Sequence, residues 1–358
     1  MKIASRYRPY LHKPGGECLI PGTLILVRAF PTRLMIQEEN GQTYQFIWNL
    51  KGLIKDFTLM QDLENQSVYV SGFAEDRFFK YKIFIEDQIV SLKLERSSKS
   101  LEAKFFSKEM EVSLSLNQNS IFKIFRTNHA LDILKSVEKL SFGQHKAQDW
   151  ELVAKRKNPQ EYLPFWFSLG QLSPLRENHD VKPPMLGHLY AAKKALKSSE
   201  KEDFLQKLHE VFLCGFQGVM VPFEQEQGFS GLNLSSDEPS QKKCYDILHY
   251  GYQLIKEMIL SLDADKICLL KNLPSLFHSG RALNFCLSDS LFDIEWSKKT
   301  LKKVHLTVFT QKTYFFSFQN SLKTFRLKEK SSKKGSIHSC FEPLTLEPGF
   351  YTLDQFKK

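Results

Sequence analysis

Short apolar stretches separated by turn residues run from Cys18 to about Arg126 and predict β structure throughout this part of the chain. From Met110 to Leu116 apolar and polar residues alternate cleanly, as in a strand with one buried face. Asn40-Gly41 stands between two apolar stretches and predicts a β-hairpin, because this dipeptide supplies turn positions with φ above zero. Repeated short strands of this kind predict an antiparallel β-sandwich.

After Arg126 the apolar residues follow a helical period. Those from Phe204 to Val219 recur at helical spacing, and Ser199 with Glu202 forms a capping-box signature in front of them. Asn158-Pro159 predicts the N-cap and first residue of another helix. Further helices are expected over 130–140, 150–156 and 186–197, and from about residue 240 to 262.

Strands return from Lys266 onward. Phe292, Ile294 and Trp296 alternate with two acids, so we expect the three apolar side chains to share one buried face. Short strands continue to the end of the sequence and predict a second all-β sandwich. The sequence thus predicts an α+β multidomain protein: an N-terminal antiparallel β-sandwich (1–126), a central helical region (127–265) and a C-terminal β-sandwich (266–358).

One segment of about 40 residues resembles a known family. Leu273-Pro274, Ser279-Gly280, the strand Phe292 to Trp296 and the lysine-rich turn from Lys299 to Leu301 are similar to a junction in glycoside hydrolase family 95 and related (α/α)-barrel glycosidases. There a helical barrel meets a C-terminal β domain, and an N-terminal β-sandwich precedes both. A complete barrel has about twelve helices and needs well over about 300 residues. The region between residues 126 and 265 is too short for a complete barrel. The resemblance therefore implies either a shrunken relative that lost catalysis or a β-sandwich protein that shares only the terminal domain.

Glycoside hydrolysis needs two carboxyl groups that face one sugar bond. A first candidate cluster comprises His145, Asp149, Trp150 and Glu151, with the two acids as catalytic groups and His145 and Trp150 as substrate-binding groups. An indole ring suits this role because it offers an apolar face and an N–H donor. The same residues have a structural interpretation, in which Asp149 caps a helix and Trp150 lies in the core.

A second candidate cluster contains the catalytic candidates Glu224 and Glu226 in a loop with Gly228 and Gly231. The structural interpretation of these acids is that they are solvated loop residues. No spacing in the sequence predicts a cofactor or a metal: the six cysteines lie far apart, and zinc sites need closely spaced Cys or His pairs.

Basic residues concentrate between Ser297 and Lys334, where eleven Lys and Arg stand against one acid, Glu329. This segment alone therefore accounts for the net charge of +10. Lysines that alternate with apolar residues are typical of the solvated face and protected edges of a sheet, which we favour over an anion-binding surface. Nucleic acid is not favoured as a partner, because Lys far outnumbers Arg in the chain.

No run reaches the roughly 18 apolar residues that a transmembrane helix needs, and the start of the sequence has no apolar segment typical of a signal peptide. We therefore expect a cytoplasmic protein with no membrane span and with reduced cysteines.

Three functions follow from these observations. The sequence favours a non-catalytic or degenerate glycosidase-like protein that acts as a scaffold or interaction module, with a protein or an oligosaccharide as partner. An alternative is a carbohydrate-active protein, a hydrolase or a sugar binder, that uses the acids of the central region. A second alternative is binding of anionic partners through the basic C-terminal sheet. Whether the chain is an enzyme stays open at this stage.

Overall fold

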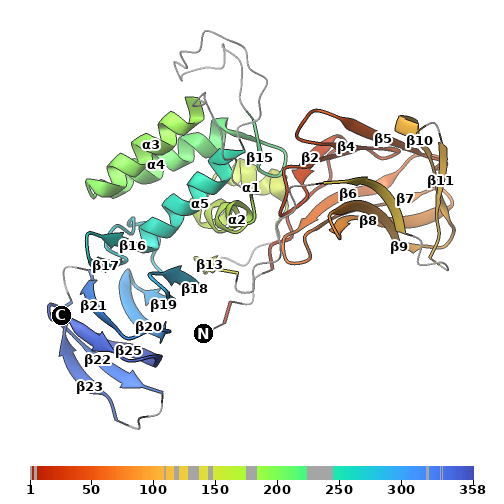
Figure 1. Cartoon of the computed structure of the whole chain (residues 1–358). Helices are drawn as coiled ribbons and strands as arrows, with labels where there is room; N and C mark the ends of the chain where they lie inside the picture. Colours follow the sequence, from red (N-terminus) through yellow and green to blue (C-terminus); the bar gives the residue numbers. More distant parts are fainter. Residues whose placement is uncertain are drawn as a thin grey trace.

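Figure 1 shows the computed structural model of the chain. The structure describes residues 2–3, 6–108, 110–116, 121–127, 137–143, 148–174, 184–223, 245–319, 322–330, 332 and 334–358. Within these residues strands outnumber helices, and nearly all strand pairs are antiparallel. The α-helices lie between the sheets of the first third of the chain and those of the last third (Figure 1).

The first sheet has six strands in the order β1-β6-β7-β8-β9-β12. In that order they span Tyr10–Leu11, Lys55–Asp62, Ser67–Ala74, Arg77–Glu86, Ile89–Ser97 and Ile121–Arg126. The second sheet also has six strands, in the order β11-β10-β5-β4-β3-β2. These span Met110–Leu114, Leu101–Phe105, Thr43–Trp48, Arg33–Gln37, Leu26–Ala29 and Gly16–Leu19. The prediction of strands from Cys18 to Arg126 is confirmed.

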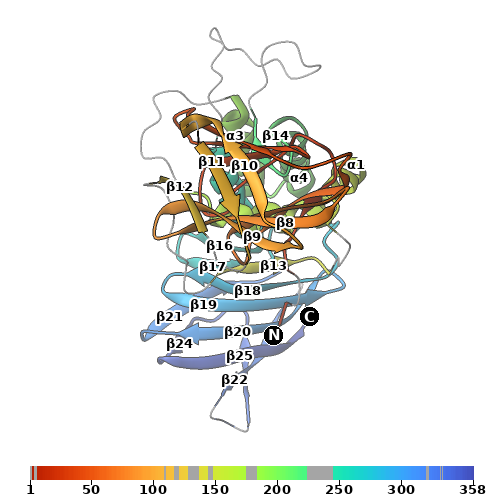
Figure 2. The ribbon, with the colours of Figure 1, turned by 90° about the vertical axis from the view of Figure 1, so that its right-hand side faces the viewer.

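Aromatic side chains fill the space between these two sheets. Trp48 of β5 donates its indole N–H to the hydroxyl of Tyr81 of β8 over 3.1 Å. Tyr44 of β5 stacks on Phe125 of β12 with ring centroids 4.4 Å apart. Figure 2 shows β10 and β11 of the second sheet above β8 and β9 of the first. The two sheets share a core because each strand turns every second side chain inward.

The predicted hairpin at Asn40-Gly41 joins β4 to β5. Gly41 has a φ of +91°, and Asn40 accepts a hydrogen bond on its side-chain oxygen from the backbone N–H of Gln42. The turn runs over residues 38–42, closed by a bond from Glu38 N to Gln42 O of 2.8 Å. Gly41 is therefore the residue of this pair that supplies the left-handed conformation.

The described α-helices confirm most of the helical pattern. They are α1 (Trp150–Arg156), α2 (Pro159–Gln171), α3 (Pro184–Lys197), α4 (Lys201–Cys214) and α5 (Asp246–Ile259). Asn158 is the N-cap of α2, where its side-chain oxygen accepts from the backbone N–H of Gln160 at 3.0 Å, and Pro159 begins the helix. Both residues do what their types predict.

The capping box predicted in front of α4 is wrong. The N-cap of α4 is Glu200, which makes no side-chain capping bond, and Ser199 has a φ of +62°. The Ser199 hydroxyl instead lies 3.3 Å from the side-chain oxygen of Asn272, and the Glu202 carboxylate accepts from the backbone N–H of Ser275. Contacts with residues 272–275 thus replace the local pair.

Two of the predicted helices differ in extent from the elements that the structure shows. Of the helix expected over 130–140, residues 130–136 lie outside the described part, and Lys139–Ser141 form strand β13. The helix expected from about residue 240 to 262 is α5, which ends at Ile259 and passes directly into strand β16 (Leu260–Asp263); residues 240–244 lie outside the described part. In both places pairing with another strand overrides the apolar spacing.

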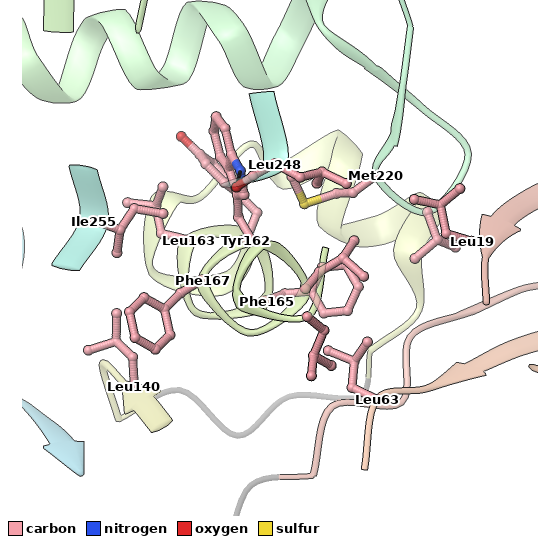
Figure 3. Close-up of a cluster of buried hydrophobic side chains, with 14 of the residues drawn as sticks. Leu19, Leu63, Leu140, Tyr162, Leu163, Phe165, Phe167, Met220, Leu248 and Ile255 are labelled. Carbon is pink, nitrogen blue, oxygen red and sulfur yellow. Dashed lines mark hydrogen bonds between the residues drawn. The ribbon is translucent and has the colours of Figure 1, made fainter. Parts of the chain in front are cut away.

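Helices α2 and α5 cross at very short distance. A Cβ on Gly251 would lie 2.2 Å from the indole ring of Trp166, and a Cβ on Gly170 would lie 2.2 Å from the carbonyl oxygen of Leu248. The Trp166 indole N–H donates to that same carbonyl over 3.2 Å. Figure 3 shows α2 surrounded by apolar side chains, with Phe165 on the side of Leu63 and Phe167 toward Leu140.

The last third of the chain forms two more sheets. The seven-stranded sheet has the order β13-β18-β19-β20-β25-β22-β23 and the four-stranded sheet the order β16-β17-β21-β24. Their strands not yet given are β17 (Lys266–Leu269), β18 (Gly280–Leu287), β19 (Ser290–Ser297), β20 (Thr300–Val308), β21 (Lys312–Ser317), β22 (Thr324–Glu329), β23 (Ser336–Ser339), β24 (Leu344–Leu346) and β25 (Gly349–Lys357). In the lower half of Figure 2, β18, β19, β20 and β25 follow one another.

The expected boundary between residues 265 and 266 lies within a hairpin. β16 and β17 pair antiparallel on either side of it, with Asp263 opposite Lys266. Strand β13, which lies in the region expected to be helical, pairs with β18 at the edge of the seven-stranded sheet. The C-terminal sheets therefore recruit strands from before residue 266.

The face predicted for Phe292, Ile294 and Trp296 is confirmed. The three side chains are at most 1% exposed. The indole N–H of Trp296 donates to the carbonyl of Phe277 over 3.1 Å.

Candidate functional site

A small pocket lies where the segment before β1 meets α1 and α2, and we call it the Trp150 pocket. Its walls are the aromatic side chains of Tyr7, Phe142, Trp150 and Phe165, and its polar lining includes Gln148, Arg156, Gln160 and Glu161. The cavity volume is about 40 Å³. One water needs roughly 10–15 Å³, and ligand pockets usually measure roughly 300–1,000 Å³. The pocket therefore suits one small group rather than a chain of sugars.

Trp150, which the sequence suggested for sugar stacking, packs within the core. Its ring lies 4.8 Å from that of Phe165 and 6.5 Å from that of Phe212, and the residue is 5% exposed. A stacking platform needs an open ring face, which this packing does not provide. Trp150 is thus a wall of the pocket and an anchor of α1.

Asp149 caps α1. Its backbone is extended, and its carboxylate accepts a hydrogen bond from the backbone N–H of Leu152 over 3.2 Å. Neither Asp149 nor its neighbour Glu151 lines the Trp150 pocket. The structure places these two acids close in sequence at the start of one helix, in the arrangement of a cap and a first-turn acid.

This capping role predicts a measurable pair of effects. Asp149→Ala should lower the free energy of unfolding by about 1 kcal/mol, the usual value for loss of an N-cap. Asp149→Asn should be nearly neutral, because an amide oxygen caps equally well. Urea unfolding followed by circular dichroism measures both, and equal losses in the two variants would argue that the carboxylate charge, and not the cap, matters here.

Arg156 and Glu161 form the polar side of the Trp150 pocket. The Arg156 Nε lies 2.7 Å from Glu161 Oε2, with side chains 32% and 6% exposed. Since Nε is engaged by Glu161, the terminal nitrogens of Arg156 remain as charged donors at the pocket. A guanidinium in this position can receive one carboxylate group.

The segment before β1 is fixed to this pocket by three bonds. Tyr7 donates its hydroxyl to the carbonyl of Leu140 at 2.6 Å, and burial raises its pKa well above the usual range. The Gln148 side chain accepts from Arg8 N and donates to Arg6 O at 2.9 Å. Tyr7 is therefore a permanent hydrogen-bond donor and not an acid or base at neutral pH.

A second polar cluster surrounds Glu138, which is 6% exposed. Its Oε1 accepts from Lys256 Nζ at 2.6 Å and from Cys286 N at 2.8 Å. Its Oε2 accepts from the hydroxyl of Tyr252 at 2.8 Å. The Gln171 side chain bonds both the N–H and the carbonyl of Glu138. Burial, and then the Glu138 charge, raise the pKa of Tyr252, so the tyrosine stays protonated and donates to this carboxylate.

The remaining candidates fall outside the described residues. His145, Glu224 and Glu226 all lie in segments that the structure does not describe. In the parts of the chain it does describe, no three His, Cys, Asp or Glu side chains gather as metal ligands would, and no helix is both long and apolar enough to cross a membrane.

The basic C-terminal segment is interleaved with acids in the folded sheet. Residues opposite one another across five strands follow the order Arg281, Glu295, Lys303, Asp354, Arg326. Arg281 bonds Glu295 at 2.8 Å, and Arg326 bonds Asp354 through two nitrogens at 2.8 and 2.9 Å. Glu295 of β19 and Asp354 of β25 thus alternate with Arg281, Lys303 and Arg326 and offset their charge on this face.

Comparison of the sequence with protein families and curated proteins identifies no relative. No protein-family model and no curated protein matches this sequence. Function must therefore be argued from the geometry above.

Sequence reasoning missed Glu138 and the Arg156–Glu161 pair. Glu138 meets Tyr252, Lys256 and Cys286, which are 114 to 148 residues away. No local spacing encodes such a cluster. Its one sequence signal is an acid beside apolar Val137 and Leu140, a position where a lone charge is costly to bury.

Proposed function

We propose that the chain is a non-catalytic scaffold or interaction protein, in which the helices hold two β-sandwich units in a fixed relation. One observation carries the proposal: the central region, which contains the helices, is tied to the neighbouring sheets on both sides by a buried carboxylate. Such ties favour a rigid frame, because a buried charge is tolerated only where its partners stay in place.

The first tie joins the second sheet to the strands after α4. Glu17 of β2 is 6% exposed and pairs with Arg28 of β3. Its Oε2 accepts from the Gln217 side chain of β14 (Phe216–Gln217) at 2.7 Å. Its backbone carbonyl accepts from Val219 N at 2.7 Å, and a Cβ on Gly218 would lie 2.4 Å from that oxygen. The backbone and the side chain of Glu17 thus both hold the hairpin that β14 forms with β15 (Val221–Pro222).

The second tie is the Glu138 cluster. It joins α5, through Tyr252 and Lys256, to β18 of the seven-stranded sheet, through the backbone of Cys286. Gln171 connects the end of α2 to the same residue. Two helices and one sheet thus converge on a single residue, α5 and β18 at its carboxylate and α2 at its backbone.

The assignment of the sheets to two sandwich domains is also part of this proposal. The first and second sheets would form one sandwich domain and the seven- and four-stranded sheets another, with β13 and β16 assigned to the latter. The descent from (α/α)-barrel glycosidases suggested by residues 273–301 is likewise a proposal, in which the barrel is reduced to the helices between the sandwiches. Under it the sheets and the order of domains are retained, and the catalytic chamber is lost.

The scaffold function predicts that partner binding is independent of the candidate catalytic acids. A variant with Asp149→Asn, Glu151→Gln, Glu224→Gln and Glu226→Gln keeps the α1 cap, so it should fold like the wild type. We expect both proteins, immobilised and exposed to cell extract, to retain the same partner. Mass spectrometry of the retained proteins makes the comparison.

Hydrolysis of chromogenic aryl glycosides by the wild type, lost in this variant, would contradict the proposal. So would a change in tryptophan emission on titration with neutral oligosaccharides that Trp150→Phe abolishes. All four tryptophans are at most 5% exposed, so we expect no such change.

A further inference from the structure

The outer face of the first sheet carries aromatic rings and cations in alternation. Phe79, Tyr81 and Ile83 of β8 are fully buried toward the second sheet. The residues between and beside them therefore point the other way: Phe78, Lys80, Lys82 and Phe84. In Figure 1 this side of β8 and β9 faces away from both the second sheet and the helices.

Three cations lie over aromatic rings on this face. The Nζ of Lys80 is 4.5 Å from the ring centroid of Tyr69, and the Nζ of Lys82 is 4.7 Å from that of Phe84. The Cζ of Arg96 is 5.5 Å from the ring centroid of Phe78. Phe73, opposite Phe78 across the two strands, is 48% exposed. Rings and positive charges thus share one surface, which we call the aromatic–basic face.

Like charges lie directly opposite one another on the aromatic–basic face. Lys82 faces Lys93, and Lys80 faces Arg96, across β8 and β9. Lys123 of β12 adds a further cation one strand away. Opposed like charges destabilise a sheet, and a sheet that serves only structure normally pairs them with acids. The seven-stranded sheet does so through Glu295 and Asp354.

Within the described part of the chain, no ion pair involves any of the five cations of this face, which are Lys80, Lys82, Lys93, Arg96 and Lys123. Of the nearest acids in sequence, Asp76 pairs with Arg77 and Lys99. Glu86 and Glu95 are exposed, at the end of β8 and in an irregular position of β9. The positive charge of the face is therefore left for an external anion.

We propose that the aromatic–basic face binds single-stranded nucleic acid. Lysine and arginine side chains would contact the phosphates, and an unpaired base would stack on Phe73, which is 48% exposed. Surfaces that bind single strands combine these two features, because phosphates need cations and every base has a π-face. A duplex hides its base faces inside the stack, so it can use the cations but not the rings. The face lies outside the basic segment 297–334, where the folded sheet offsets the charge.

The test uses the full chain and fluorescein-labelled 20-nucleotide oligo(dT) and oligo(U), followed by fluorescence anisotropy at several salt concentrations. We expect binding that weakens steeply with salt, because phosphate contacts release counterions. Lys82→Glu with Lys93→Glu should weaken binding at low salt by at least about tenfold and flatten the salt dependence. The matched control, Lys302→Glu with Lys312→Glu, reverses two exposed lysines outside this face and should leave binding unchanged.

The variant Phe73→Ala tests whether the bound anion is a nucleic acid, because only a nucleic acid supplies bases that stack on this ring. Loss of a stacking ring should weaken binding about fivefold or more with an unchanged salt dependence. Circular dichroism melts verify that each variant is folded. Absence of oligonucleotide binding at low salt would overturn the proposal, as would equal effects of the face and control reversals. Unchanged affinity of Phe73→Ala, or equally tight binding of a duplex, heparin or anionic vesicles, would also overturn it, since these outcomes need only charge. None of these outcomes depends on the scaffold proposal.

Discussion

Replacing Glu138 by glutamine is expected to lower the free energy of unfolding by about 3–5 kcal/mol. The change leaves Lys256 buried without its counter-charge, with the two side chains only 19% and 7% exposed. It also replaces one of two acceptor oxygens, shared among Lys256, Tyr252 and the backbone of Cys286, by an amide that donates. Breaking one partner of a buried ion pair typically costs this much, because the remaining charge stays desolvated.

Glu295→Gln is the matched control for this prediction. Glu295 bonds Arg281 on the open face of the same sheet, where the side chains are 48% and 29% exposed. An exposed pair of this kind contributes under about 1 kcal/mol. Urea unfolding at neutral pH compares the two variants, and a loss for Glu138→Gln as small as that for Glu295→Gln would mean that the cluster is solvated in solution.

Trp296→Ala should lower the free energy of unfolding by about 3–5 kcal/mol, the range for removal of a large core aromatic. The residue is 1% exposed, its indole N–H bonds the carbonyl of Phe277, and its ring packs at an angle on Phe142 with centroids 6.1 Å apart. The ring packs directly on Gly280, where a Cβ would lie 2.3 Å from it, so this neighbour has no side chain that could fill the cavity left by truncation.

The control for this variant is Asp293→Asn on the opposite face of the same strand. Asp293 accepts a hydrogen bond from Asn284 N at 2.9 Å, and an amide oxygen can replace that acceptor. Its cost should stay below about 1 kcal/mol. An unchanged urea midpoint for Trp296→Ala would contradict the core position of the indole and would favour an exposed ring.

Local signals in the sequence predicted local structure well. Asn158-Pro159 begins α2 because its capping needs only the residues beside it, and the alternation in 292–296 predicted a buried face because a strand repeats every two residues. Ser199 and Glu202 failed as a capping box because residues 272–275, distant in sequence, compete for their side chains. Residues 139–141 became a strand because β18 offers an edge.

The candidate site was harder to predict for the same reason. Asp149 and Trp150 were rightly recognised as a possible cap and core residue, but the cavity beside them is built by Tyr7 and Phe142 from elsewhere in the chain.

The net charge of a sequence segment also says little about the charge of the surface that it forms in the folded protein. Asp354, well beyond residue 334, supplies the acid between Lys303 and Arg326.

The bonds of the segment before β1 have a consequence for protein synthesis. Tyr7 reaches Leu140, 133 residues later, and Arg8 reaches Gln148, 140 residues later. During translation the strands of the first and second sheets, the last of which ends at Arg126, leave the ribosome before these partners do. Contacts of such long sequence separation close late, since the chain entropy of the loop must be overcome first. The first two sheets can therefore assemble early and already hold residues 6–8 through Asp62, Leu63 and Glu64. The further bonds of this segment to Leu140 and Gln148 form only when the residues next to α1 have emerged.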